Sequence, residues 1–430
     1  MNDTLRRALL RGIAASVVTF IVGSGAVFAM QRIGQGDTEA PPSQPGPSEP
    51  PNDPGPAKAT TPEAHLVWVP GGFPDGFGEE LTTLRLVKQA AVATSGVGWL
   101  QRSFEADGDQ VDAPASPFMV PLDTTGIDTN TFASFLPRGP QRRLVLALQP
   151  GQAILSEAAA ALRGLGEGAT LGFAPDLDVT VVGTLPDVVM GAHEVLLPRT
   201  TAERIGVSIP RYALLRVRGQ PTEIELAEAL TELAARHTRQ ALLEVRLPGE
   251  TRYLRAHDGS VPPITLKRRF GEFTAYPNPQ EQDDLDLDPA WVEQNIETRE
   301  IPRLGSVQCH RKTLSVLTKA MAEMSAAVSL GTIGACFDDT WAPDMRRGTL
   351  PAALWGASIR LNVSLNVPGQ PPLIDGRIVE TMTAWGFRWA GNDVYPDGAL
   401  FEFLQAPSRD DGASPATAPD ETSPSPADEE

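Results

Sequence analysis

The chain has 430 residues, of which 41% are hydrophobic and 21% charged, and its formal net charge is −18. This length is enough for two or three domains of ordinary size, and the composition is that of a folded protein. The acidic balance argues against nucleic acid as a partner, because contacts to phosphates need a positive surface.

The amino-terminal segment at residues 12–30 is uncharged and mostly apolar, and three arginines precede it. As a helix it would rise about 28 Å, close to the thickness of a bilayer's hydrocarbon core. We therefore expect a transmembrane helix, with the rest of the chain outside the cytoplasm because the cations lie on its amino-terminal side. A cleaved signal peptide is the alternative, since residues 27–29 resemble a cleavage site; both alternatives export the remainder.

Two segments have compositions that do not form a core. Residues 40–62 are rich in proline and predict a semi-extended linker. Residues 406–430 consist mainly of Ser, Pro, Ala, Asp and Glu, which predicts a disordered acidic tail.

The region between them has a mixed α/β pattern. Apolar residues that recur at three- and four-residue spacing predict helices over residues 78–94, 156–165 and 223–237. Short β-rich stretches predict strands over residues 143–148 and 179–183.

One stretch of this region, ILSEAAAALRGLGEGATLGF followed by VTVVGTLPD, resembles the extracytoplasmic domain of MacB/FtsX-type permeases. In that family a short helix leads into a turn and a strand pair. The resemblance implies a scaffold or interaction module and not a catalytic one.

An acidic run at residues 283–288 raises the possibility of a calcium loop. It lacks the sharp-turn Gly and the distal Glu of such a loop, so a solvated acidic loop is favoured.

The carboxy-terminal third carries several motifs in a fixed order. An amphipathic helix is predicted over residues 310–329, and the stretches GACFDDTWAPDMRRGTLPAALWGASIRLNVSLNVPG and WGFRWAGNDVYPDGALFEF follow it. Residues 270–403 thereby resemble the VanY-type D-alanyl-D-alanine carboxypeptidase and endolysin family, zinc enzymes that cut peptidoglycan stem peptides. The resemblance implies a VanY-like α+β peptidase fold.

The family's first signature is S-x-H-x-W-G-x-A-x-D-x-N, whose His and Asp bind zinc. Trp355 and Asn362 match it, but the His position is Ala353 and the Asp position is Arg360.

The second signature is G-F-x-W-G-G-x-W followed by D-x-M-H-F-E. Trp389 matches it, and so does Asp397, at the family's general-base position. The third zinc ligand, the His, is Leu400. An Arg that holds the substrate carbonyl in the family would fall near Thr340, with Arg346 or Arg347 as substitutes.

All three zinc ligands are therefore replaced. Ala353 and Leu400 offer no lone pair, and Arg360 places a fixed positive charge where a dication would bind. We expect no metal and no other cofactor. Asp397 would then be a vestigial general-base position; the alternative is that this carboxylate has only a structural role.

Arg360 is a candidate for binding a peptide carboxylate, with Asn362, Trp355 and Trp389 as further ligand-binding candidates. The alternatives are structural: Arg360 forms a salt bridge to Asp397 or Glu402, and the tryptophans pack in the core.

Cys309 and Cys336 are the two cysteines of the chain. In an exported protein such a pair predicts a disulfide, and two buried free thiols are the alternative.

The prediction as a whole is an α+β chain with an amino-terminal transmembrane helix, a mixed α/β middle module and a carboxy-terminal VanY-like domain. The expected boundaries are 1–36 for the cytoplasmic amino terminus and transmembrane helix, 37–64 for the linker, 65–260 for the MacB-like module, 261–300 for a connector, 301–405 for the carboxypeptidase-like domain and 406–430 for the tail.

The predicted function is that of a membrane-anchored extracytoplasmic pseudo-peptidase, which binds a peptidoglycan stem peptide or an envelope protein without catalysis. One alternative is an active carboxypeptidase or endopeptidase with an unrecognised metal site. The other is an envelope assembly or transport accessory that acts through the middle module.

Overall fold

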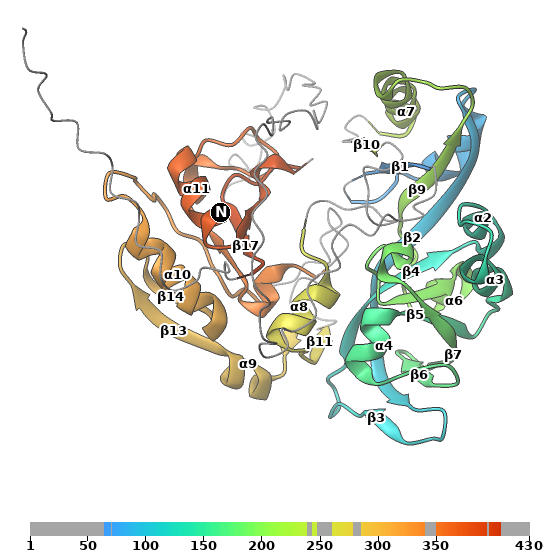
Figure 1. Cartoon of the computed structure of the whole chain (residues 1–430), viewed down its shortest axis with the longest axis horizontal. Helices are drawn as coiled ribbons and strands as arrows, with labels where there is room; N and C mark the ends of the chain where they lie inside the picture. Colours follow the sequence, from blue (N-terminus) through green and yellow to red (C-terminus); the bar gives the residue numbers. More distant parts are fainter. Residues whose placement is uncertain are drawn as a thin grey trace, which may run out of the picture.

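The computed structural model describes residues 64–69, 71–238, 243–246, 260–277, 285–339, 350–393 and 395–405. The expected transmembrane segment, linker and acidic tail lie outside these residues. Within them, no helix combines the length and the apolar character that a membrane span requires. The fold is of the mixed α+β type and has two lobes, a middle lobe of residues 64–246 and a carboxy-terminal lobe of residues 260–405 (Figure 1).

The middle lobe is built around one long strand, β2 (Val87–Phe104). Its first part pairs with β9 (Pro210–Val217), and its second part pairs with β4 (Val120–Ile127) and then β6 (Thr170–Phe173). From β4 the pairing continues through β8 (Val195–Pro198), β5 (Gln152–Ser156) and β7 (Leu177–Leu185) back to β6. The second part of β2 therefore belongs to a closed ring of six strands.

The ring closes tightly at Gly98 in β2. A Cβ atom there would lie 2.8 Å from Thr124 Oγ1 and 3.0 Å from the Phe173 ring, which a side chain does not tolerate. Apolar side chains from all six strands form one buried cluster, among them Leu100, Leu122, Leu155, Val181 and Leu197. Burial of this cluster stabilises the ring.

The first part of β2 lies in an open sheet of order β10–β1–β9–β2, with β1 (His65–Trp68) and β10 (Glu244–Arg246). Helices α1 (Phe77–Glu80) and α7 (Glu223–His237) pack on it through one apolar cluster. The remaining elements of the lobe are a 3-10 helix (Leu81–Thr83), β3 (Gln110–Asp112), α2 (Thr129–Ser134), α3 (Pro140–Ala147), α4 (Glu157–Arg163), α5 (Asp187–Met190) and α6 (Arg199–Arg204).

The structure confirms three of the elements that we expect in this lobe. The predicted helix 223–237 is α7, with Thr222 as its N-cap in a capping box. The predicted helix 156–165 is α4, which Ser156 caps through the backbone N–H of Ala159. The predicted strand 179–183 lies inside β7.

Two predictions are wrong. Residues 78–94 form α1, a 3-10 turn and the start of β2 instead of one helix, because residues 87–94 gain backbone partners in β9. Residues 143–147 lie in α3 instead of a strand, and Leu148 follows as its C-cap: Pro140 occupies the first turn, and Val145 is buried in the helix.

The carboxy-terminal lobe begins with α8 (Pro263–Phe270) and packs around one apolar core. Its other elements are β11 (Ala275–Pro277), β12 (Leu285–Leu287), α9 (Pro289–Asn295), β13 (Ile296–Ile301), β14 (Gly305–His310), α10 (Arg311–Glu323), β15 (Ser358–Arg360), α11 (Gly376–Ala384), β16 (Phe387–Trp389), β17 (Leu400–Phe403) and 3-10 helices at Ala352–Trp355, Val363–Leu365 and Ala390–Asn392. The predicted helix 310–329 is α10, which is shorter and ends at Glu323.

The expected connector contributes directly to this lobe. Phe270, Phe273 and Trp291 lie in the same buried cluster as Trp355. Of the acidic run, residues 285–287 form β12 instead of a loop, and Asp288 caps α9 by accepting from the N–H of Ala290 at 2.9 Å. Residues 283–284 lie outside the described part.

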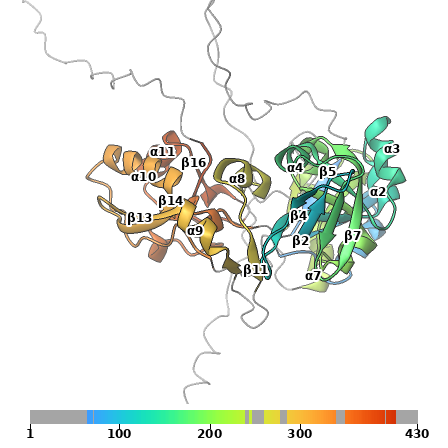
Figure 2. The same ribbon diagram turned by 90° about the horizontal axis from the view of Figure 1, so that it is seen from below.

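The two lobes meet along a continuous boundary. Met119 and Ala275 exchange backbone hydrogen bonds of 2.9 and 2.8 Å, so β11 lies next to the sheet of the middle lobe. Trp99 of β2 also packs on the core of the carboxy-terminal lobe. Figure 2 shows α8 and β11 between the two lobes.

Candidate functional site

The positions that hold zinc in the VanY-type family lie around one short sheet. β15 and β17 pair so that Arg360 is directly opposite Leu400. Ala353 lies in a neighbouring 3-10 helix, and its carbonyl accepts from Asp338 at 3.2 Å. The segment that contains Asp338 also donates from Gly334 to the carbonyl of Arg360 at 2.9 Å, so one segment contacts both regions.

Arg360 is held by the carboxylate at the vestigial general-base position. Its Nη2 lies 2.8 Å from Asp397 Oδ2, with the Arg360 side chain 30% exposed and that of Asp397 2% exposed. Asp397 also accepts from the N–H of Ala399 at 3.3 Å, which shapes the turn before Leu400. The two residues thus have the structural roles that we gave as alternatives, and a role for either in ligand binding stays a prediction.

Glu402, the other partner that we considered for Arg360, binds Arg388 instead. Arg388 donates to Glu402 at 2.6 and 3.0 Å and to Asp393 at 2.6 and 3.1 Å. Burial disfavours the charge of Arg388, but the two carboxylates together raise its pKa above the ordinary value. The sheet β15–β17–β16 therefore carries two arginines, Arg360 with one acidic partner and Arg388 with two.

The tryptophans and asparagines of the motifs have internal partners. Trp355 is fully buried and donates to the carbonyl of Gly271 at 2.9 Å, and Trp389 donates to the carbonyl of Gly398 at 2.9 Å. Asn362 adopts a left-handed conformation with φ 56°. Asn366 donates to the carbonyl of Asn362 at 3.0 Å and so closes this turn. Ligand binding by Asn362, Trp355 and Trp389 stays a prediction.

The cysteine prediction is confirmed, since Cys309 and Cys336 form a disulfide. The bond joins the end of β14 to the segment at residues 333–338, and the backbone of Phe337 donates to Gln308 at 2.9 Å beside it. The disulfide thereby fixes the segment that contacts Ala353 and Arg360.

Metal binding can be judged only for the described residues. Among those residues, no three His, Cys, Asp or Glu side chains are grouped so that they could hold a metal ion. Thr340, Arg346 and Arg347 lie outside the described residues. The prediction of a zinc-free site depends on the side chains at positions 353, 360 and 400 and is tested below.

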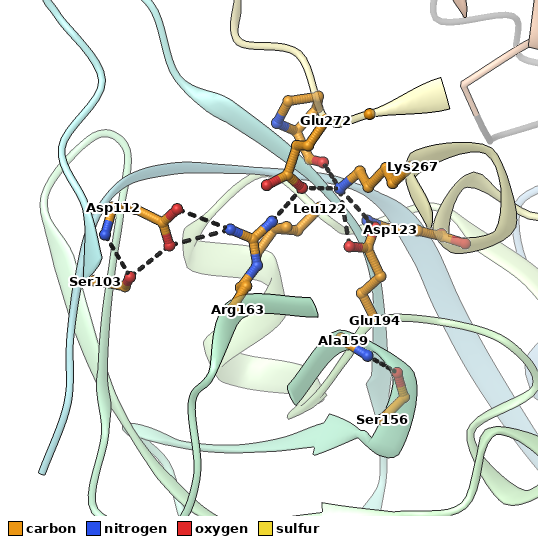
Figure 3. Close-up of polar contacts among 12 residues, drawn as sticks. Ser103, Asp112, Leu122, Asp123, Ser156, Ala159, Arg163, Glu194, Lys267 and Glu272 are labelled. Carbon is orange, nitrogen blue, oxygen red and sulfur yellow. Dashed lines mark hydrogen bonds and ion pairs between the residues drawn. The ribbon is translucent and has the colours of Figure 1, made fainter. Parts of the chain in front are cut away.

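A second polar site, which the sequence analysis did not predict, lies at the boundary between the lobes (Figure 3). Lys267 of α8 lies 2.8 Å from Glu194 and 3.0 Å from Glu272. Arg163 of α4 pairs with Asp112 of β3 at 3.0 Å and also with Glu272. We call these five residues the junction network.

The cations of the junction network are fully enclosed. The side chains of Lys267 and Glu194 are 0% exposed and that of Arg163 is 2% exposed. Lys267 also donates to the carbonyl of Pro121 at 2.5 Å, and Glu194 accepts from the N–H of Asp123 at 2.9 Å. Charges at such depth need this many partners, because the loss of water is costly for each of them.

Burial and pairing act in opposite directions on the acids of the junction network. Burial raises the pKa of Glu194, and the nearby Lys267 and Arg163 only partly offset it. For Glu272 burial also opposes ionisation, but Lys267 and Arg163 prevail and lower its pKa. Glu272, on the carboxy-terminal lobe, is therefore held ionised by the two cations that it contacts.

The sequence holds no signal for this arrangement. Glu194 and Lys267 are 73 residues apart, and Arg163 and Glu272 are 109 apart. Lys267 stands in the run Lys267-Arg268-Arg269, which reads as a solvated basic turn of a helix.

No protein-family model and no curated protein sequence matches the chain. Among solved structures, the periplasmic region of MacB from Actinobacillus actinomycetemcomitans is similar to it with a TM-score of 0.31 and 13% identity, over 44% of this chain and 90% of that one. The extracellular domain of the noncanonic ABC-type transporter YknZ from Gram-positive bacteria is similar with a TM-score of 0.28 and 11% identity, over 43% of this chain and 98% of that one.

Both structures are extracytoplasmic domains of the class that part of the middle lobe resembles in sequence. At these scores and identities, the likeness assigns no activity and no partner to the chain.

Proposed function

We propose that this chain is a non-catalytic extracytoplasmic protein of the bacterial envelope, an assembly or transport accessory that engages its partner through the middle lobe. The junction network is the observation that carries this proposal. Its buried ion pairs join the carboxy-terminal lobe to the middle lobe. The pseudo-peptidase prediction, in contrast, treats the carboxy-terminal lobe as the working domain.

The contacts of α8 and of Glu272 hold the two lobes together. An enzyme domain carried on a tether needs only a linker, but here Lys267 is enclosed by groups of the middle lobe and Glu272 pairs with Arg163. A buried pair is strongly destabilising when one partner is removed, so the two lobes support each other. This favours a scaffold with a fixed arrangement.

The contacts at the positions that the carboxypeptidase resemblance assigns to a catalytic site support a non-catalytic role. Arg360 forms an ion pair with Asp397, so the cation is neutralised where a substrate carboxylate would have to bind. Asp397 in turn is engaged by the Arg360 guanidinium, so the carboxylate at the position that the resemblance gives to a general base already has a partner.

The middle lobe offers exposed apolar positions for contact with a partner. Leu146 of α3 is 40% exposed and Leu162 of α4 is 37% exposed. Arg143 is exposed three residues before Leu146 on the same helix, so this part of the lobe combines apolar and cationic side chains. Such a mixture suits a protein interface.

The proposal is tested by photo-crosslinking in cells that express the full chain. A photoreactive amino acid replaces Leu146 or Leu162 in one set of strains, and exposed Leu373 in another. We expect a defined crosslinked product with an integral membrane protein from the first set. Products only from position 373, or none from either middle-lobe position, would contradict the proposal.

Stem-peptide binding by the carboxy-terminal lobe is a second candidate, favoured by one surface. Leu365, Val367 and Leu373 are 59%, 61% and 67% exposed. Their loop lies close to Asp397, since the neighbouring Gly398 packs on Asn366 and Pro372 of this loop. Crosslinking of cell-wall material at position 373 alone would support this candidate over the first.

A further inference from the structure

Four cations gather where α8 ends and α10 begins. Arg268 and Arg269 lie in the last turn of α8, and Arg311 and Lys312 lie in the first turn of α10. Lys312 donates from Nζ to the carbonyl of Arg269, so the two helix ends are in direct contact. We call these four residues the basic cluster.

No acid of the described part of the chain pairs with the basic cluster. Over the described ranges, none of its side chains forms an ion pair with a carboxylate. Burial lowers the pKa of Arg269, and no acidic neighbour opposes this effect. In a chain with a net charge of −18, a group of four unpaired cations needs an explanation.

Local electrostatics make the cluster an unfavourable place for positive charge. Arg311 and Lys312 occupy the first turn of a 13-residue helix, where the helix dipole favours anions and disfavours cations. Both also act on the buried imidazole of His310, whose pKa is lowered to about 4, first by burial and then by Lys312 and Arg311. An anion placed here would relieve all of these interactions.

The described chain ends against this cluster. Gln405 is its last described residue, and the side-chain oxygen of Gln405 accepts from Arg269 Nη2 at 3.5 Å. The backbone of Gln405 is fixed as well, because its N–H donates to Gly386 at 3.2 Å. The sequence that follows therefore leaves the fold beside the basic cluster.

That following sequence has the complementary charge. Residues 406–430 contain seven carboxylates and one arginine: Asp410, Asp411, Asp420, Glu421, Asp428, Glu429 and Glu430 against Arg409. Asp410 is five residues beyond Gln405, so its carboxylate stays within about 18 Å of the exit point. A tether this short gives an effective concentration on the order of millimolar.

We propose that the acidic segment 406–430 binds the basic cluster of its own chain. The segment then supplies the carboxylates that the positive surface at the ends of α8 and α10 lacks among the described residues. Salt weakens the contact, because it forms between exposed charges.

A zero-length carbodiimide crosslink on the full chain tests this contact directly. The carbodiimide activates a carboxylate, and the Lys312 amine then displaces the activating group from the acyl carbon. An amide bond forms, and the carbodiimide takes up the water that is lost. We expect amides between Lys312 and acids of residues 406–430, at least tenfold more abundant than those to Lys319. Lys319 is the matched control, since it is an exposed amine on the same helix.

Two further arms make the result decisive. The full-length variant R268A/R311A keeps the Lys312 amine and should reduce its yield severalfold, as should 0.5 M salt (about a 4 Å screening length). Mixing isotope-labelled and unlabelled chains separates contacts within one molecule from contacts between two. Equal yields at Lys312 and Lys319, no product at Lys312, or products only between two chains would each overturn the proposal.

Discussion

His310 shows how burial and local charge set the chemistry of one side chain. The residue is 2% exposed, caps α10 by accepting from the N–H of Lys312 at 3.0 Å, and packs on Phe270. Burial is the largest cause that lowers its pKa to about 4, and the cations Lys312 and Arg311 add to it. The imidazole is therefore neutral in the folded protein at all but acidic pH.

This neutrality makes stability depend on pH. Because the folded pKa is below the model value of 6.5, the unfolded chain binds a proton between about pH 6.5 and 4 while the folded chain does not. His310 should therefore add full stability above pH 6.5 and lose it as the pH falls. The expected loss is on the order of 2 kcal/mol at pH 4.5.

Urea unfolding at pH 7.5 and 4.5 checks this prediction against His310→Asn. Asparagine is a good N-cap and carries no titratable group. The wild type should lose more free energy of unfolding on acidification than the variant does. An equal loss in the two proteins would show that His310 does not have a depressed pKa.

Positions 353, 360, 397 and 400 could be chosen from the sequence because the signatures of the carboxypeptidase resemblance fix their order, and that resemblance stays a prediction. Arg360 was foreseen as a partner of Asp397, which the structure contains. The junction network could not be foreseen, since Glu194 and Lys267 have no local relation and belong to different lobes. Contacts between residues far apart in the sequence depend on how whole helices and strands pack, and the pattern of a single segment does not report that packing.

At the scale of elements, sequence patterns succeeded where a local signal and the tertiary environment agree. Helix α7 has a capping box and an apolar face, and it was predicted over its full length. The sequence pattern predicts a helix at the start of β2, because the spacing of its apolar residues fits the helical period as well as the strand period. Pairing with β9 decided the outcome, and no single-segment pattern reports such a partner.

The disulfide between β14 and the segment at residues 333–338 should be a strong element-level constraint. It closes a loop with a sequence separation of 27. Replacing both Cys309 and Cys336 by alanine should lower the free energy of unfolding by about 3.5 kcal/mol, from the chain entropy regained by the unfolded state. Guanidinium unfolding of the double variant measures this difference.

Reduction of the wild type provides the control for that experiment. Without reductant the wild type should be the more stable protein, and with reductant it should approach the double variant. Equal stability of oxidised wild type and double variant would contradict a structural role for this bond.

At the scale of the molecule, the junction network should make the two lobes unfold together. Lys267→Met would leave Glu194 buried without its cation, which should cost about 3–5 kcal/mol. Changing the exposed Lys319 to Met on α10 should alter the free energy of unfolding by less than about 0.5 kcal/mol. Urea unfolding, followed by fluorescence and by circular dichroism, measures both.

A double variant separates the lost ion pair from the added methionine. In Lys267→Met/Glu194→Gln the buried acid is no longer charged, so part of the lost stability should return. Two separate unfolding transitions in the wild type would show that the lobes are independent, which contradicts one body.

The central claim is that this chain acts by binding and not by catalysis, and it is supported by the alanine, arginine and leucine at the positions where the carboxypeptidase resemblance would place zinc ligands. The zinc content of the purified full chain, after incubation with zinc and removal of the excess, tests this most directly. The account predicts no stoichiometric zinc. One zinc per chain that a chelator removes would contradict it.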